Sequence, residues 1–354
     1  EGQRILGQMD LPAYPERRPG DNWDGQYVPV GTLAMPGRSH PGVVLICRVG
    51  YDVEGRGVLL VDPLAGEVVW RRDLDAKLRP WSGAVVDLDG DGRREIVTTS
   101  DACDNLDGQT YVGAGDDSSR VFVFEADGRT RWQQAVGGSG SSAIARVADL
   151  DGDGLREVIV LGRRPRGPRS QLSVWSASGK SRASVEHAEL ALSSIVIARG
   201  GEGVPVVATM ESTGGLRIYR WRGGDLRAVA SSSLAATGGD LAAVDVIADV
   251  PGDEVVILAR SLVEIRDTEL KKLAAFRTAE GVRASHLVAW RAAPGRRLVM
   301  AADGVHDAVT FRPSPSGVSV AAVVGGGAAG IGLIGFFWFR RRPRAGAAPV
   351  RETD

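Results

Sequence analysis

The chain has 354 residues, of which 43% are hydrophobic and 6% aromatic, and its 43 Lys and Arg against 44 Asp and Glu leave a formal net charge of -1. This length and apolar content suffice for one large core or two modest ones. The balanced charge excludes the basic stripe that is typical of nucleic-acid-binding proteins. A cluster of arginines surrounds Pro165 and Pro168, and the Pro and Gly residues there favour a solvated loop. The members of this cluster are Arg163, Arg164, Arg166 and Arg169.

Short apolar β runs occur in pairs along the chain, and the pairs recur at intervals of roughly 45 to 60 residues. The first members read TLAMP, AVVDL, AIARVADL, SSIVIA, LAAVDVIA and SHLVAW. Second members include GVVLICR, VPVVATM, EVVILA and RLVMAA. These pairs indicate a repeated structural unit built from strands.

A hairpin pattern follows the pairs. Residues 58–70 and 121–132 alternate around a glycine-centred turn and end in Trp70 and Trp132, each four residues past the glycine. Residues 172–183 keep the hairpin without the tryptophan. Alternation with altered turns continues at 216–230 and 262–276. With two hairpins, each unit has four strands.

Six such units predict an all-β fold, namely a six-bladed β-propeller of four-stranded antiparallel blades over residues 31–312, with a seven-bladed ring as the alternative. The sixth unit has only three expected strands, because Pro313 and Pro315 end its pattern, and residues 313–317 are expected to form a linker. Residues 1–30 have no sheet of their own. We therefore expect Gln3–Leu11 to pair with the last blade and close the ring, since open sheet edges are normally avoided.

The strongest local signal is an acidic loop that occurs twice: VVDLDGDGRREIVTTS at residues 85–100 returns as VADLDGDGLREVIVLG at 147–162. Side chains at positions 1, 3 and 5 of a tight loop converge, and glycines allow the positive φ angles that such a curl needs. These carboxylates, a backbone carbonyl and an acid at position 9 form a hard oxygen ligand set that suits Ca²⁺ better than Mg²⁺. An EF-hand places its last acid at position 12, before a helix. Here a β-branched run follows, so each loop belongs to a β-hairpin.

These loops and their flanking strands resemble FG-GAP/VCBS repeats, as found in integrin α-subunit propellers, and the hairpins ending in tryptophan resemble the repeats of PQQ-type propellers. The resemblance covers about residues 20–312, and two of the six units carry the strong motif. It implies that each loop binds Ca²⁺ through acidic side chains and one backbone carbonyl. The implied ligands are Asp87, Asp89, Asp91, Glu95 and the carbonyl of Arg93 in the first loop, and Asp149, Asp151, Asp153, Glu157 and the carbonyl of Leu155 in the second.

The chain departs from the family pattern in two ways. The Phe-Gly pair is replaced by Trp81-Ser82-Gly83 and by Gly138-Ser139-Gly140, and the loop of the fifth unit, residues 248–253, is too short to carry the ligand set. The alternative to calcium is that the aspartates only cap turns and pair with neighbouring arginines. Those arginines would be Arg93, Arg94 and Arg156.

An uncharged run of apolar and small residues, 318–339, is long enough to cross a bilayer as a helix. Arginines follow it at Arg340, Arg341, Arg342 and Arg344. This order predicts a single-pass membrane protein with residues 340–354 as a basic cytoplasmic tail and the propeller on the extracytoplasmic side. A sorting signal that is removed after export is the alternative to a permanent anchor. Small residues at four-residue spacing, Ala322, Gly326 and Gly330, offer a stripe for a partner membrane helix, although a lone anchor fits equally well.

No catalytic constellation is apparent, because the four histidines are scattered and none has metal-ligand spacing. The sequence therefore favours a calcium-stabilised propeller that binds a protein or glycan partner, or an accessory subunit of a membrane complex, over an enzyme. The alternative is a propeller enzyme of the quinoprotein or polysaccharide-acting type, with its site in the central channel. Export would permit a disulfide between Cys47 and Cys103, whereas Cys47 also fits a buried apolar position.

Overall fold

The computed structural model describes residues 26–48, 56–106, 109–164, 170–188, 191–234, 239–247, 250–259, 262–277, 286–293, 296–303, 307–314, 317–323 and 336–337. All regular elements in this part of the chain are β-strands, and consecutive strands pair antiparallel in sets of four. The first set is β1 (Gln26–Ala34), β2 (Pro41–Arg48), β3 (Gly57–Asp62) and β4 (Glu67–Asp73). The second is β5 (Lys77–Val86), β6 (Glu95–Asp101), β7 (Ser119–Phe124) and β8 (Thr130–Gly137).

Three further sets repeat this order. The third is β9 (Ser142–Ala148), β10 (Glu157–Arg163), β11 (Ser170–Trp175) and β12 (Ser181–His187), joined to the second through one β6–β9 pair. The fourth is β13 (Leu192–Arg199), β14 (Pro205–Glu211), β15 (Gly215–Arg222) and β16 (Asp225–Ser233). The fifth is β17 (Asp240–Val244), β18 (Glu254–Ala259), β19 (Leu262–Arg266) and β20 (Lys272–Arg277).

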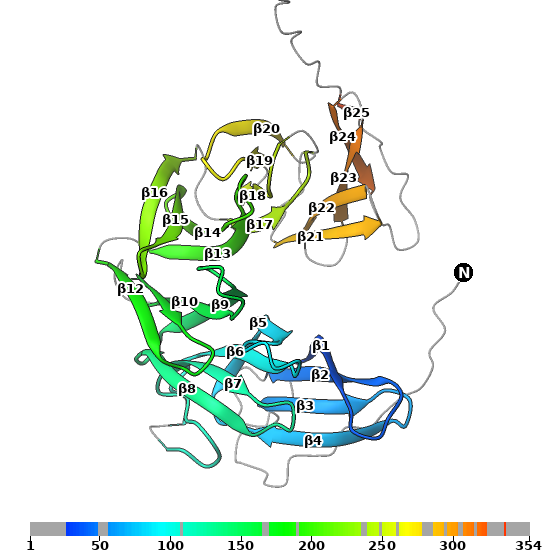
Figure 1. The fold of residues 1–354 in the computed structure, drawn as a ribbon, viewed down its shortest axis with the longest axis vertical. Helices are drawn as coiled ribbons and strands as arrows, with labels where there is room; N and C mark the ends of the chain where they lie inside the picture. Colours follow the sequence, from blue (N-terminus) through cyan, green and yellow to red (C-terminus); the bar gives the residue numbers. More distant parts are fainter. Residues whose placement is uncertain are drawn as a thin grey trace, which may run out of the picture.

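The sheets follow one another around an arc (Figure 1), and the first strands of successive sets contact each other along its inner side. The core lies in layers between neighbouring sheets. One layer joins Leu60 of the first set to Phe122 and Phe124 of the second, and another joins Leu172 of the third to Val207 of the fourth. Second strands such as β6 and β10 are buried on both faces, which explains why their sequences are continuous β-branched runs rather than alternating ones.

A tryptophan ties the end of one sheet to the hairpin turn of the next. Trp70 Nε1 donates to the Ala126 carbonyl at 3.0 Å, and Trp132 Nε1 donates to the Ala177 carbonyl at 2.9 Å. The turn glycine under each ring leaves room for it: a Cβ on Gly179, whose φ is +79°, would lie 2.7 Å from the Trp132 ring. The tryptophan and the turn glycine of the sequence repeat are therefore partners across adjacent sheets.

The sixth set is more complete than the sequence predicts. It consists of β21 (His286–Ala293), β22 (Arg296–Asp303), β23 (Asp307–Ser314) and β24 (Gly317–Val323), with the short β25 (Phe336–Phe337) beyond β24. The strand pattern does not stop at Pro313, because β23 continues to Ser314 and β24 starts at Gly317; of the expected linker over 313–317, residues 315–316 lie outside the described part of the chain. Pro313 lies beyond the part of β23 that pairs with β22, and a strand tolerates proline where one neighbour is missing.

The predicted N-terminal boundary also shifts, because β1 starts at Gln26 and residues 26–30 belong to the first sheet. Gln3–Leu11, expected to close the ring, lies outside the described residues.

The two ends of the predicted membrane helix are extended in the structure, as β24 and β25, and their backbones pair with each other. Residues 324–335 and 338–354 lie outside the described part of the chain, so the membrane span over 318–339 stays a prediction. The part of the chain that the structure describes contains no helix with the length and apolar character of a membrane span.

The two cysteines are free thiols. Cys47 is buried in β2, in one apolar cluster with Leu59 and Val61, and its burial raises the pKa of the thiol to about 11. Cys103 lies in the loop after β6, in a different sheet. The disulfide interpretation is wrong for this structure, and Cys47 acts as the buried apolar residue that was its alternative.

The contact between the turn glycine and Trp132 predicts how two alanine variants differ. Gly179→Ala and Gly224→Ala both force a Cβ onto a left-handed residue, with φ of +79° and +82°, which costs roughly 1–2 kcal/mol of unfolding free energy. A Cβ at Gly224 meets nothing within 4 Å, whereas one at Gly179 meets the Trp132 ring. In urea unfolding, we expect Gly179→Ala to lose roughly 1–3 kcal/mol more than Gly224→Ala. Equal losses would contradict the proposed role of the ring contact.

Candidate metal centres

The first acidic loop connects β5 to β6 and is held by its own carboxylates. Asp87 Oδ1 accepts from the Gly90 amide at 2.8 Å and Oδ2 accepts from the Gly92 amide at 3.0 Å. Both glycines have positive φ, +74° and +84°, which allows the chain to curl around the carboxylate. At the end of the loop, Glu95 Oε2 accepts from the Leu88 amide at 2.8 Å.

The second loop, between β9 and β10, repeats these bonds. Asp149 accepts from the amides of Gly152 at 2.7 Å and Gly154 at 3.0 Å. Glu157 Oε2 accepts from the Leu150 amide at 2.9 Å. The shared motif therefore has one local structure, in which the first acid holds the curl and the last acid fastens the loop to the start of the strand.

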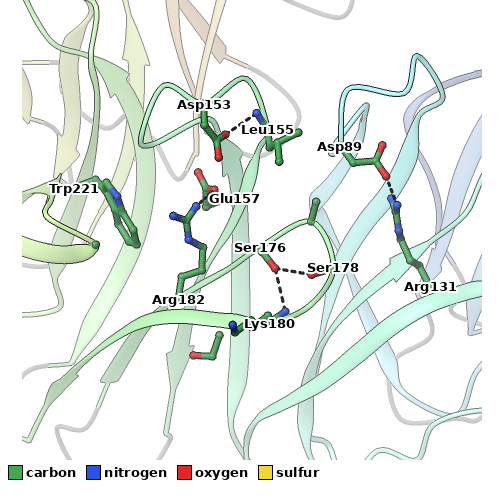
Figure 2. Close-up of a pocket in the computed structure, with 13 residues that line it drawn as sticks. Asp89, Arg131, Asp153, Leu155, Glu157, Ser176, Ser178, Lys180, Arg182 and Trp221 are labelled. Carbon is green, nitrogen blue, oxygen red and sulfur yellow. Dashed lines mark hydrogen bonds and ion pairs between the residues drawn. The ribbon is translucent and has the colours of Figure 1, made fainter.

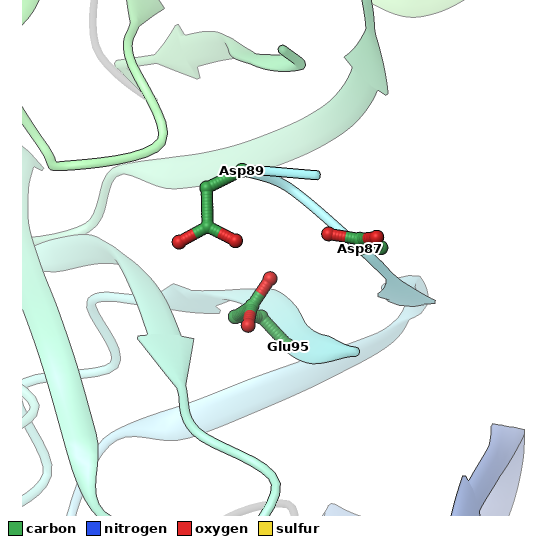
Figure 3. Close-up of side chains that lie close together, drawn as sticks. All are labelled: Asp87, Asp89 and Glu95. Carbon is green, nitrogen blue, oxygen red and sulfur yellow. The ribbon is translucent and has the colours of Figure 1, made fainter. Parts of the chain in front are cut away.

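Three acids of each loop converge. One carboxylate oxygen from each of Asp87, Asp89 and Glu95 lies within 4.8 Å of the others (Figure 3). The same holds for Asp149, Asp151 and Glu157. Both glutamates are buried, at 1% and 2% exposure, and the aspartates are more open.

The remaining predicted ligands lie outside these clusters. Asp91 Oδ1 accepts from the Arg93 amide at 2.7 Å, and Asp153 Oδ1 accepts from the Leu155 amide at 2.8 Å. The third aspartate of each loop is thus a turn cap in this structure, as the calcium-free alternative expects for the aspartates. The carbonyls of Arg93 and Leu155 remain predicted ligands.

A bulge in the fourth strand of each set supplies a side chain that the sequence reasoning missed. The third and fourth strands of the first five sets shift register at the same point, which leaves one residue of the fourth strand outside the ladder. Those residues are Val69, Arg131, Arg182, Val229 and Leu273. A bulge can re-aim the side chain that it displaces. Arginine occupies this position only in the two sets that carry the acidic loop.

Arg131 neutralises part of the first cluster. It forms an ion pair with Asp89 and lies 3.3 Å from Glu95 and 3.5 Å from Glu125. The hydrogen bond from Arg131 lowers the pKa of Asp89. Burial raises the pKa of Glu95, and Arg131 opposes that effect.

Arg182 does the same in the second cluster, at 2.7 Å from Asp151 and 2.5 Å from Glu157. Its guanidinium also lies 4.9 Å above the Trp221 ring. Figure 2 shows Arg182 pointing towards Glu157 beside Trp221, at the edge of a pocket of about 610 Å³ that Asp89 and Arg131 also line. The arginine is held between the acids and an aromatic face.

The arginines that the sequence suggested as partners make other contacts. Arg156 Nη1 donates to the backbone carbonyl of Asp87 at 2.9 Å, and Arg94 Nη1 donates to the Thr32 carbonyl at 3.4 Å. Among the described residues, neither they nor the side chain of Arg93 pairs with a loop carboxylate. The sequence did contain a signal that could have identified the true partners. Arg131 and Arg182 occupy the same place in their hairpins, directly before Trp132 and directly before Ala183.

The fifth loop shows what happens without the arginine. Glu254, which corresponds to Glu95, is fully buried, and its Oε2 accepts from the amides of Val246 at 2.5 Å and Ile247 at 3.1 Å. Its Oε1 is buried without a hydrogen-bond partner among the described residues. The bulge residue here is Leu273, which packs against the apolar core. No described residue forms an ion pair with Glu254, and burial raises its pKa to about 7.

The sequence matches no protein-family model, and a search of the curated proteins finds no match either. The likeness to FG-GAP/VCBS repeats therefore rests on the loop motifs themselves.

Solved structures do resemble this chain. Crystals of BBS1N in complex with ARL6DN, soaked with lead or with mercury, contain a chain that aligns with TM-scores of 0.53 and 0.51 at 9% and 10% identity, covering 84% of this chain and 90% or 89% of that one. Sqt1 of Saccharomyces cerevisiae aligns with a TM-score of 0.48 at 10% identity, covering 82% of this chain and 83% of Sqt1. At such identities the BBS1N likeness shows the fold alone, which is all-β and propeller-like.

Burial of Glu254 predicts a pH dependence. The pKa is raised from its ordinary value of 4.5 to about 7, so the folded state binds the proton more tightly than the unfolded state does. The resulting stability is fully present below about pH 4.5 and is lost as the pH rises through 7. Glu254→Gln is neutral throughout, so we expect its unfolding free energy relative to wild type to grow by at most roughly 2–3 kcal/mol between pH 5 and pH 8.

Chemical unfolding of both proteins across this pH range measures the difference. Glu269→Gln, at an exposed position in the same sheet, serves as the control and should run parallel to wild type. A Glu254→Gln curve that also runs parallel would show that Glu254 is ionised in the folded protein at every pH.

Proposed function

We propose that this chain is a six-bladed β-propeller that binds a protein partner, with calcium supporting its two acidic loops. The observation that carries the binding role is a groove of about 1030 Å³ between the first and second sheets. Its lining includes the apolar residues Leu33, Met35, Leu60, Val69 and Trp70. The arginines Arg38, Arg93, Arg94 and Arg129 line it as well.

The composition of this groove favours a protein partner over a glycan. Tryptophan, methionine and arginine are enriched at protein interfaces, and a buried aromatic anchor surrounded by charge is typical of binding hot spots. Arg38 and Arg129 are paired with acids at 2.7 Å each, to Glu67 and Asp127. The side chain of Arg93 has no carboxylate partner within the described residues. The structure of BBS1N with ARL6DN supports this proposal to the extent that a propeller-like fold of this kind was crystallised with a protein partner.

The bulge position offers a matched test of the groove. Val69 and Val229 are equivalent bulge residues with similar exposure, 43% and 41%, but only Val69 lines the groove. We expect a photo-crosslinking amino acid at position 69 to give discrete adducts in native membranes, and one at position 229 to give none. Arg93→Glu should weaken the adducts formed at position 69. The same adducts from both positions, or none from position 69, would contradict a partner in this groove.

Calcium is supported by the charge and chemistry of the two clusters. Three carboxylates against one arginine leave a formal charge of about -2 in each, which a divalent cation would neutralise, and all the donors are hard oxygens. Asp87, Asp89 and Glu95 would hold one ion, and Asp149, Asp151 and Glu157 the other. The two ions would support the fold rather than perform chemistry.

Because Arg182 uses oxygens that the ion would need, the arginine and the calcium compete. We expect Arg182→Gln to be less stable than wild type without calcium and to bind Ca²⁺ at least about tenfold more tightly, since one positive charge is removed from the ligand set. Calorimetric titration with Ca²⁺ and melting curves with and without chelator measure both effects. Asp151→Asn, the control, should bind one ion fewer. Loss of calcium binding in Arg182→Gln would exclude competition, and no binding in any variant would exclude the sites.

Membrane attachment through residues 318–339 is proposed on the sequence, which places an uncharged run before an arginine cluster. It would require the strands β24 and β25 to give way to a helix, since the same residues cannot adopt both conformations. Protease added to intact cells should then digest the sheets and spare the tail, whereas digestion of the tail alone would exclude this orientation.

A further inference from the structure

A large irregularity in β5 places a tryptophan on the inner side of the arc. Arg79 pairs with Thr99 and Ala84 pairs with Val97, so the four residues 80–83 of β5 oppose a single residue of β6. Trp81 lies in this bulge and is 50% exposed, which is unusual for so large an apolar side chain. Because β5 and β9 are inner strands of the arc, the bulge belongs to its inner surface (Figure 1).

The bulge is fastened on both sides. The hydroxyl of Ser82 is buried, accepts from the Ala145 amide of β9 at 2.7 Å, and lies at hydrogen-bond distance, 2.8 Å, from the Thr99 hydroxyl of β6. Gly83 packs so closely on β1 that a Cβ there would lie 2.6 Å from Val30. The segment Trp81-Ser82-Gly83, which stands where the repeat family has a Phe-Gly pair, therefore contacts β1 of the first set and β9 of the third set.

Arginines from the same three sheets surround Trp81. The guanidinium of Arg48, from the end of β2, lies 4.7 Å from the centre of its ring, and that of Arg79 lies 5.1 Å away. Arg146 Nη1, from β9, donates to the Trp81 carbonyl at 3.5 Å. Stacking on the indole holds such a side chain in place while its fork of N–H donors stays available.

The acids nearby balance these charges only in part. Asp101 pairs with Arg79 at 2.6 Å, and Asp240, the carboxylate that acts on Arg146, accepts a hydrogen bond from Ser194 at 3.1 Å. Among the described residues, neither Arg48 nor Arg146 has a carboxylate within ion-pair distance.

Arg163, at the end of β10, adds a fourth positive charge. The sequence predicted a solvated loop here, but Arg163 is half-buried at the end of a strand. It has no ion-pair partner within the described chain. Burial lowers the pKa of both Arg146 and Arg163. The positive charge of Arg79 lowers it further, whereas Asp240 raises the pKa of Arg146 and Asp101 raises that of Arg163. Four arginines against these two aspartates leave the place positively charged, and an anion between the arginines would reduce their repulsion.

We propose that this inner surface, formed by Trp81 with Arg48, Arg79, Arg146 and Arg163, binds an acidic segment of a protein partner. The proposal rests on the protein-binding function proposed above and names the chemistry of the partner. It concerns a different surface from the groove beside Val69. Partner binding in the groove and acidic-peptide binding at the inner surface can therefore be tested and disproved independently.

Two observations favour an acidic peptide over other anions. The guanidinium groups come from three successive sheets, which suits carboxylates spaced along a chain better than one small anion. The Trp81 ring already has two guanidinium groups over it, so the site offers arginine forks rather than an open indole face on which a sugar could stack. Arginine forks bind carboxylates with two parallel hydrogen bonds.

The test uses the full chain in mild detergent and a fluorescein-labelled peptide of eight glutamates, followed by fluorescence anisotropy at low salt. We expect saturable binding to wild type. Arg48→Gln and Arg163→Gln should each weaken it at least about tenfold, because each removes charge-assisted hydrogen bonds. Arg48→Lys keeps the positive charge but loses the paired N–H donors of the guanidinium group. Its affinity for the peptide should lie between those of wild type and Arg48→Gln. Arg222→Gln removes an exposed arginine at the end of β15 and should bind like wild type.

Melting temperatures of the variants establish that they remain folded. No saturable binding, or equal weakening by Arg222→Gln, would overturn the proposal. Phosphate or citrate that displaces the peptide at equal concentration would show a small-anion site instead, and tighter binding of an oligogalacturonate of the same charge would show an acidic-glycan site. If the peptide does not bind but the adducts at position 69 form, the acidic partner is excluded and the protein-binding function stands.

Discussion

A buried glutamate at the start of the second strand is the constraint on which the acidic loops depend. Glu95, Glu157 and Glu254 occupy this place in three sheets, and each accepts one or two amides from the loop before it. The bond fixes where the loop ends and the strand begins. A carboxylate taken out of water also needs a compensating charge or a proton, because desolvation disfavours its ionised form. The three loops differ in whether an arginine or a proton compensates for the burial of this glutamate.

Two different solutions occur within one chain. In the second and third sheets the bulge of the fourth strand carries Arg131 or Arg182, and the loop keeps its cluster of aspartates. In the fifth sheet the bulge carries Leu273, Ile247 stands where the first loop has Asp89, and the high pKa of Glu254 allows a proton to compensate for the burial of the carboxyl group. The arginine thus accompanies the acidic loop and would set the strength of any cation bound there. A cluster that is already paired with arginine would hold calcium more weakly than the carboxylates alone, and a bound ion would stabilise the fold by correspondingly less.

Local patterns were enough to predict the strands, the hairpins and the curl of the acidic loops, because each of these depends on residues close together in the sequence. The arginine contacts of the two sites could not be predicted, because they join residues that lie far apart in the sequence. Arg131 lies 42 positions from Asp89, and only the register of β7 and β8 brings them together. Trp81 was recognised as a departure from the family pattern, but its arginine neighbours come from other sheets. The strand β24 was hidden because its valines and alanines also fit an apolar helix.

Infrared difference spectroscopy tests the buried-glutamate account most directly. A protonated carboxyl group has a C=O band that is distinct from that of a carboxylate, so a titration from pH 5 to pH 9 reports which state Glu254 adopts. The account predicts that wild type loses one protonated-carboxyl band as the pH passes through about 7, and that Glu254→Gln lacks this change. A wild-type spectrum with no such band in this range would contradict it, because Glu254 would then be buried as an uncompensated charge.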